Sequence, residues 1–157
     1  MSRAFTREDD SEGAIADFGE RPVSPHRNLV TRKGLAMIEE TLAGLRKDLA
    51  HAEAESDRSR IAALSRDLRY WTARRENAEL AEPDPGSTVV RFGMTVAIEG
   101  EDGKRRSWKI VGEDEADAAS GSISHVSPMA QALFGRSSGD VVSVSGKEWE
   151  IVDLQAG

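Results

Sequence analysis

The apolar positions between residues 31 and 52 repeat with the spacing of an amphipathic helix. They lie at alternate steps of three and four residues, with charged residues on the other faces: Leu35, Ile38, Leu42, Leu45, Leu49 and Ala52. Thr31 is a suitable N-cap residue for such a segment. The pattern predicts a helix that begins near Thr31 and buries one stripe of side chains.

A second apolar stripe follows, with Ile61, Leu64, Leu68 and Trp71 at steps of three, four and three. Between the stripes lies the polar segment AEAESDRSR, in which Ser56 or Asp57 can cap a new helix. Two stripes joined by a short polar link predict an antiparallel helical hairpin over residues 31–80. One continuous helix is the alternative, because the link contains neither glycine nor proline.

The second half of the chain has the signals of strands and turns. The segment AEPDPGST predicts a linker at residues 81–88, and past it the apolar period shifts towards two. We expect strands in TVVRFGMTVAIEG and SWKIV around a turn at 102–103, an extended GSISHV, a short helix in SPMAQALFG that ends at Gly135, and a terminal hairpin that turns at 145–146. Residues 89–157 are therefore predicted to form a small antiparallel β domain with one short helix, and the fold class is α+β.

Residues 1–30 are polar and contain Pro22 and Pro25, which favour extended backbone. We interpret this segment as an extended or disordered arm, with disorder expected for residues 1–20. Apolar side chains that could hold it against a neighbouring surface are Phe5, Ile15, Phe18, Val23 and Leu29.

Composition narrows the classes of function. The 157 residues carry a net charge of −7, which disfavours phosphate-driven DNA binding as the main activity. The absence of cysteine excludes disulfides and thiolate metal sites. His26, His51 and His125 lack ligand spacing, and we interpret His125 as a structural or exposed imidazole. With no apolar run of membrane length and no secretory signal, we expect a cytoplasmic protein.

Two acidic clusters are candidate sites. Glu113, Asp114, Glu115 and Asp117 lie within five residues but lack the pattern of a calcium loop, which favours a solvated or capping turn over a metal site. Glu53, Glu55 and Asp57 lie at the predicted hairpin tip. A solvated turn is the simplest interpretation of the tip. A charged tip on a rigid arm also suits insertion into a channel, where carboxylates could lie beside a catalytic magnesium ion.

Several segments resemble the Gre-type bacterial transcript cleavage factors. VRFGMTVAIE, WKIVGEDEADAASGSIS, SPMAQALFGRSSGDVVSV and KEWEIVDL are similar to the FKBP-like C-terminal domain of that family, over residues 89–154. LVTRKGLAMIEETLAGLRKDL resembles the start of its coiled coil.

The resemblance implies a partner and a mechanism. The C-terminal domain would grip RNA polymerase at the rim of its secondary channel through Val126, Ser127, Pro128 and Met129. The coiled coil would enter the channel, where Glu53 and Asp57 could help to hold a polymerase Mg²⁺. Nucleic acid would be reached only through the elongation complex. We expect a monomer without its own cofactor or intrinsic catalytic activity.

One departure from the family pattern limits what the resemblance implies. RRENAEL at residues 74–80 is similar to the family's tip motif, but it lies beside the proline linker, so Glu76 and Glu79 are predicted at the base of the hairpin. A short hairpin also resembles the Rnk branch, whose members bind polymerase without stimulating cleavage. An active cleavage stimulator is the alternative. An FKBP-type prolyl isomerase is a weaker one, because Phe92, Trp108, Phe134 and Trp149 show no pocket pattern.

Overall fold

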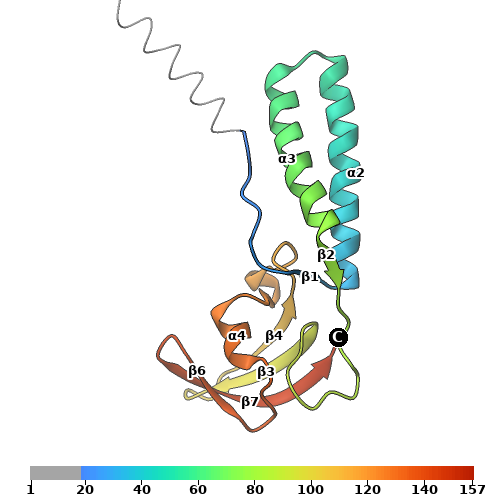
Figure 1. The fold of residues 1–157 in the computed structure, drawn as a ribbon. Coiled ribbons are helices and arrows are strands. Elements are labelled where there is room, and N and C mark those ends of the chain that lie inside the picture. Colours follow the sequence, from blue (N-terminus) through green and yellow to red (C-terminus); the bar gives the residue numbers. More distant parts are fainter. Residues whose placement is uncertain (1–18) are drawn as a thin grey trace, which may run out of the picture. The chain divides into compact units, whose positions relative to one another are not determined.

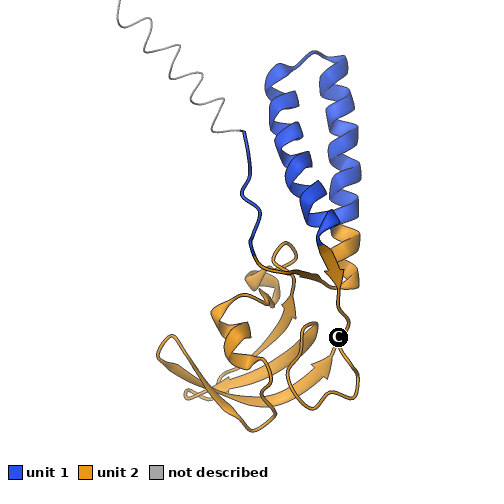
Figure 2. Ribbon diagram, viewed as in Figure 1, with its two compact units in different colours: residues 1–25, 38–77 blue, residues 26–37, 78–157 orange. Residues whose placement is uncertain are grey.

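The computed structural model describes residues 19–157 (Figure 1). The described residues divide into two compact units, of which the first comprises residues 19–25 together with 38–77, and the second comprises 26–37 and 78–157 (Figure 2). The units interleave along the sequence, so their boundaries differ from the predicted ones at residues 30, 80 and 88. The first turns of the hairpin belong with the C-terminal domain.

Two antiparallel helices form the hairpin, α2 over Arg32–Ala54 and α3 over Arg58–Glu76. The predicted hairpin is confirmed, and the continuous helix is wrong. Ser56 has φ of 53°, outside the helical region, and the Asp57 carboxylate accepts a 3.2 Å hydrogen bond from the backbone N–H of Arg60 as the N-cap of α3. The helices are about 34 Å and about 28 Å long, at about 1.5 Å per residue.

The predicted apolar stripes are buried to different degrees. In α2, Ile38, Leu42 and Ala52 are buried, whereas Leu45 and Leu49 are half-buried. All four stripe residues of α3 are only half-buried: Ile61, Leu64, Leu68 and Trp71. The one buried residue of α3 is Arg74, at 1% exposure. Helix α3 is thus held by a thinner apolar contact than the sequence pattern predicts.

A two-stranded parallel sheet joins segments 50 residues apart in the sequence. Strand β1, Asn28–Val30, pairs with β2, Ala78–Leu80, with Asn28 opposite Ala78. Residues 78–80 were predicted as helix and 28–30 as part of the arm, and both expectations are corrected. Asn77 ends α3 as its C-cap, so the chain leaves the helix four residues earlier than predicted.

The C-terminal domain is a five-stranded sheet in the order β5-β4-β3-β7-β6. The strands are β3 Met94–Gly100, β4 Arg105–Val111, β5 Ser122–Ser124, β6 Val141–Val144 and β7 Lys147–Ala156. The pairs are antiparallel except β4 with β5, which is parallel, so the sheet is mixed rather than wholly antiparallel. The loop after β4 and the 3-10 turn η1, Ala118–Ser120, return the chain so that β5 runs parallel to β4.

The core of this domain lies between the sheet and the short helix α4, Pro128–Leu133. Its buried side chains are Val90, Phe92, Val96, Ile98, Ile110, Ala130, Leu133, Val142 and Ile151. The predicted helix signals are confirmed, because Ser127 Oγ accepts a 3.3 Å hydrogen bond from Ala130 N–H and Gly135 has φ of 76°. The predicted α+β class is confirmed.

Candidate functional site

The hairpin tip holds three carboxylates with different surroundings. One Asp57 oxygen caps α3, and Glu55 pairs with Arg60 at 3.4 Å. Glu53 is exposed one turn earlier, at the end of α2. Across residues 19–157, no group of three or more His, Asp or Glu side chains could hold a metal ion. The tip therefore presents separate carboxylates and not a preformed cation site.

The start of α4 presents a fixed surface turn. Ser127 and its neighbours are held by short hydrogen bonds, from Ser127 N–H to the Ser124 carbonyl at 2.9 Å and from Val126 N–H to Ser124 Oγ at 3.2 Å. Pro128 is exposed, whereas Val126 and Ser127 are half-buried and Met129 packs against the core. Of the four residues predicted to contact a partner, Pro128 is therefore the most accessible.

His125, just before this turn, belongs to the fold. Its side chain is 6% exposed and its ring meets Phe92 edge-on, with 5.6 Å between ring centroids. Its carbonyl accepts a 2.7 Å hydrogen bond from the Gln131 side chain, which ties the turn to α4. Of the two predicted possibilities, a structural or an exposed imidazole, the burial of His125 favours the structural one.

The conspicuous acidic run after β4 is a capping turn. Asp117 is the N-cap of η1, where its carboxylate accepts hydrogen bonds from Ala119 N–H at 3.2 Å and Ser120 Oγ at 2.6 Å. Glu115 accepts a hydrogen bond from the Thr31 hydroxyl, and Thr31 in turn accepts one from Gly34 N–H at 2.9 Å. The capping interpretation is confirmed for Asp117, whereas Glu115 bonds a side chain; Thr31 is the predicted N-cap of α2.

Two distant sequence motifs meet at this turn. A Cβ on Gly34 would lie 2.6 Å from the Glu115 carboxylate, and a Cβ on Gly112 would lie 2.5 Å from the Leu29 backbone oxygen. At Gly112 the close atom belongs to the backbone, so this position requires glycine, whereas at Gly34 the end of the Glu115 side chain would have to shift. The T-x-x-G start of the first helix and the G-E-D-E run after β4 are thus two halves of one contact, which the sequence did not reveal.

Comparison with known proteins defines the relationship of this chain to a family. A family model described as "Transcription elongation factor, GreA/GreB, C-term" matches residues 85–155. Transcription elongation factor GreA from Anaeromyxobacter sp. (strain K) is 34% identical over 148 residues, covering 78% of this chain and 88% of that protein.

The chain belongs to the GreA/GreB family of transcription elongation factors. GreA of Paracoccus denitrificans is 30% identical over 80% of this chain and 96% of its own length. Among solved structures, GreA factor homolog 1 (Gfh1) of Thermus thermophilus is 24% identical, with 83% of this chain and 100% of that chain covered and a TM-score of 0.41.

The structure places the tip-like motif at the base of the hairpin, where the sequence predicted it. In RRENAEL, Glu76 ends α3 and Glu79 lies in β2, so neither residue is at the tip, as predicted. Glu79 accepts two hydrogen bonds from the Arg27 guanidinium, at 3.1 and 3.2 Å. This bidentate pair links the ends of β1 and β2. In this GreA/GreB family member, the motif serves the base of the hairpin.

The Arg27–Glu79 pair predicts a pH dependence. The hydrogen bond from Arg27 lowers the pKa of Glu79 below its ordinary value of 4.5, and the same bond raises the pKa of Arg27. Because the folded state lowers the pKa of the carboxylate, the ionised group stabilises the fold at pH values above its ordinary pKa. This stabilisation is lost as the pH falls through the lowered pKa. We expect Arg27→Ala to raise the pKa of Glu79 towards 4.5, measured by NMR titration of its side chain. An unchanged pKa would show that the pair does not persist in solution.

The aromatic residues of the GreA/GreB-like domain do not form the pocket of a prolyl isomerase. Phe92 lies in the core at 8% exposure, and Trp108, Phe134 and Trp149 pack against that core. A cavity of about 220 Å³ beside Trp149 is otherwise lined by polar and charged residues and a glycine. Neither this geometry nor any of the comparisons supports isomerase activity.

In residues 19–157, no helix combines the length and apolarity needed to cross a membrane.

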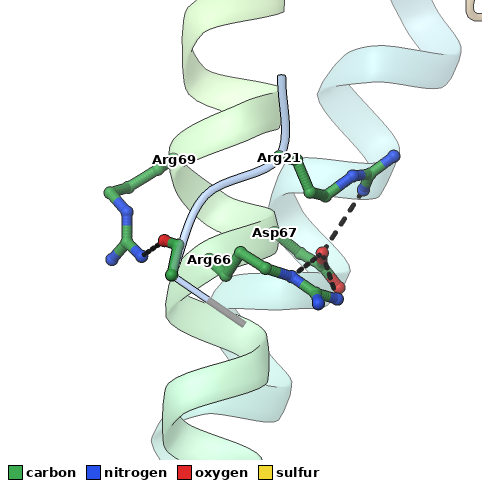
Figure 3. Close-up of polar contacts among 5 residues, drawn as sticks. Arg21, Arg66, Asp67 and Arg69 are labelled. Carbon is green, nitrogen blue, oxygen red and sulfur yellow. Dashed lines mark hydrogen bonds and ion pairs between the residues drawn. The ribbon is translucent and has the colours of Figure 1, made fainter. Parts of the chain in front are cut away.

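Residues 19–25, here called the strap, lie along α3 (Figure 3). The Arg69 guanidinium bonds the Gly19 carbonyl at 2.6 Å and the Glu20 carboxylate at 3.0 Å. Arg21 pairs with Asp67 at 3.3 Å, and its guanidinium lies 3.9 Å from the centre of the Tyr70 ring.

The strap corrects the prediction of how the arm is held. Val23 was expected to hold it by apolar contact, but this side chain is 41% exposed. Leu29 does pack against the core of the C-terminal domain. Phe5, Ile15 and Phe18 lie outside the described residues.

Proposed function

We propose that this chain binds bacterial RNA polymerase at its secondary channel and regulates transcription elongation there. The turn at Val126, Ser127, Pro128 and Met129 would contact the channel rim, and the α2–α3 hairpin would enter the channel. The observation that carries the proposal is family membership over 78% of the chain, which includes both the hairpin and the C-terminal domain. The rigid turn that exposes Pro128 supports the choice of contact surface.

The geometry of the tip favours binding without cleavage. Holding a second Mg²⁺ in the polymerase active centre needs carboxylates that are available and convergent. Asp57 is committed to capping α3, and Glu55 already pairs with Arg60. We therefore propose a regulator that binds polymerase without stimulating cleavage. We also propose that it acts as a cytoplasmic monomer, has no cofactor of its own, and meets Mg²⁺ only within the polymerase complex.

Binding to purified core polymerase tests the proposal. We expect the wild type to bind and Pro128→Ala to bind about tenfold more weakly. A tenfold decrease in affinity is roughly the effect of losing one well-packed contact residue. Pro85→Ala is the matched control, since Pro85 is exposed in the linker away from α4, and it should bind like the wild type. If the wild type does not bind, the proposal fails. Equal binding by Pro128→Ala would reject only the assigned contact surface.

Active cleavage is the alternative that the exposed Glu53 keeps open. Backtracked elongation complexes with Mg²⁺ would be incubated with the wild type and with a Glu53→Gln/Asp57→Asn variant. Asparagine caps helices as well as aspartate, so the variant removes charge while it keeps the cap of α3. We expect uncut RNA with both proteins. Cleavage by the wild type alone would establish the tip carboxylates as functional.

A further inference from the structure

The strap changes the surface that α3 presents. Helix α3 has six arginines and two acidic residues in 19 positions. The strap supplies a carbonyl and a carboxylate to Arg69, and its Arg21 takes one oxygen of Asp67. Arg21 also covers the face of Tyr70, whose ring meets Trp71 edge-on. Charged and aromatic groups in the middle of α3 are therefore in contact with the strap.

The strap contacts are suited to reversible closure. The side chains of Arg69 and Glu20 are 51% and 73% exposed, and those of Arg21 and Asp67 are 37% and 26% exposed. Solvent-exposed ion pairs contribute little individually and are screened by salt. Several of them acting together with the stacked guanidinium can keep a short segment in place, yet a binding partner can displace it.

The position of the strap matters if the hairpin enters a channel. Its contacts fall on residues 67–71, which are about 14–20 Å along the axis from the start of α3 at Arg58. An arm inserted deeper than this distance would bring the strap against the channel wall. The strap would then have to enter with the hairpin or leave α3.

We propose that the strap is an autoinhibitory contact, which covers the middle of α3 in the free protein and leaves it when the hairpin engages RNA polymerase. This inference rests on the proposed function. When only a fraction of the protein molecules is in the conformation that can bind, the apparent affinity equals the intrinsic affinity multiplied by that fraction. Weakening the strap therefore increases the apparent affinity for polymerase.

Arg21→Ala tests the inference, because it removes both the Asp67 pair and the stacking on Tyr70. Arg27→Ala is the matched control, an arginine beside β1 whose exposed ion pair is with Glu79 of β2. We expect Arg21→Ala to bind core polymerase about three- to tenfold more tightly than the wild type, as if the strap were closed about 70–90% of the time. Arg27→Ala should bind like the wild type.

The outcomes separate this inference from the proposed function. If the wild type and Arg21→Ala bind equally well, the autoinhibitory role is rejected and polymerase binding stands. If neither binds, the proposed function fails and the inference fails with it. Binding by Arg21→Ala alone would support both.

A distance measurement gives an independent readout. The chain has no cysteine, so nitroxide labels at Val23→Cys and Ser59→Cys would report only the strap and α3. In the free protein we expect one narrow distance distribution, which Arg21→Ala broadens. Saturating polymerase should broaden or lengthen the wild-type distances. An unchanged narrow distribution in the complex would overturn the displacement of the strap.

Discussion

Replacing Arg74 with alanine is expected to destabilise the hairpin by about 3 kcal/mol or more, the loss typical of breaking a buried charged contact. Arg74 is 1% exposed and is the one buried residue of α3. A guanidinium carries five N–H donors, and burying it without partners is too costly for a stable fold. Arg74 does have an interaction partner, so truncation removes that interaction and opens a cavity.

The neighbouring residue provides a matched control. Arg75 pairs with Glu39 at 3.0 Å on the surface, with side chains 46% and 53% exposed. We expect Arg75→Ala to cost only about 0.2–1 kcal/mol. Urea unfolding followed by circular dichroism at 222 nm, which reports on helix, would measure both variants.

A third variant separates packing from hydrogen bonding at Arg74. Arg74→Met keeps much of the side-chain volume but none of the donors. If the methionine variant is as unstable as the alanine variant, the polar contacts of Arg74 carry the effect. If both variants unfold like the wild type, the burial of Arg74 has no energetic role and the prediction is wrong.

The helices and most of their ends, though not the end of α3, were predictable because their signals are local. Steps of three and four residues identified the α2 stripe, and the caps Thr31, Asp57 and Ser127 each bond a backbone N–H three residues later. Gly135 and the pair Ser145–Gly146 have positive φ, as their turns require. Each of these features depends on neighbours within about one turn, so a single sequence contains the necessary information.

Contacts between distant segments were not predictable for the opposite reason. The β1–β2 pair joins three-residue strands about 50 positions apart, and three residues are too few to give a clear alternating pattern. The strap is held by Arg21, whose partners on α3 are 46–50 residues away. Polar contacts of this kind leave no period in the sequence.

The candidate site was predicted in position but not in chemistry. Glu53, Glu55 and Asp57 do lie at the tip. Which of the three is committed to a cap depends on where α3 begins, and the sequence allowed Ser56 or Asp57. The acidic run after β4 shows the same limit, because the partner of Glu115 is Thr31, 84 residues earlier.

Replacing Gly112 with alanine is expected to destabilise the C-terminal domain by about 1–3 kcal/mol, the usual cost of overpacking a fixed contact. The added Cβ would lie 2.5 Å from the Leu29 carbonyl oxygen, which is a backbone atom and cannot rotate away. Leu29 is itself held, by pairing in β1 and by packing against the core. Relief would therefore require β1 or the turn after β4 to move. The measurement is urea unfolding followed by tryptophan fluorescence, since Trp108 and Trp149 both lie in this domain.

Gly44→Ala is the control for this substitution, and its expected sign is opposite. Gly44 lies inside α2, and a Cβ there would have no atom within 4 Å. Alanine at an open helix position should stabilise the hairpin by about 1 kcal/mol. A loss at Gly112 together with a gain at Gly44 would show that Gly112 is required by its contact with β1, and not by backbone flexibility. A neutral Gly112→Ala would mean that β1 yields easily, and the contact between the G-E-D-E run and the start of the hairpin would then be too weak to hold these two motifs together.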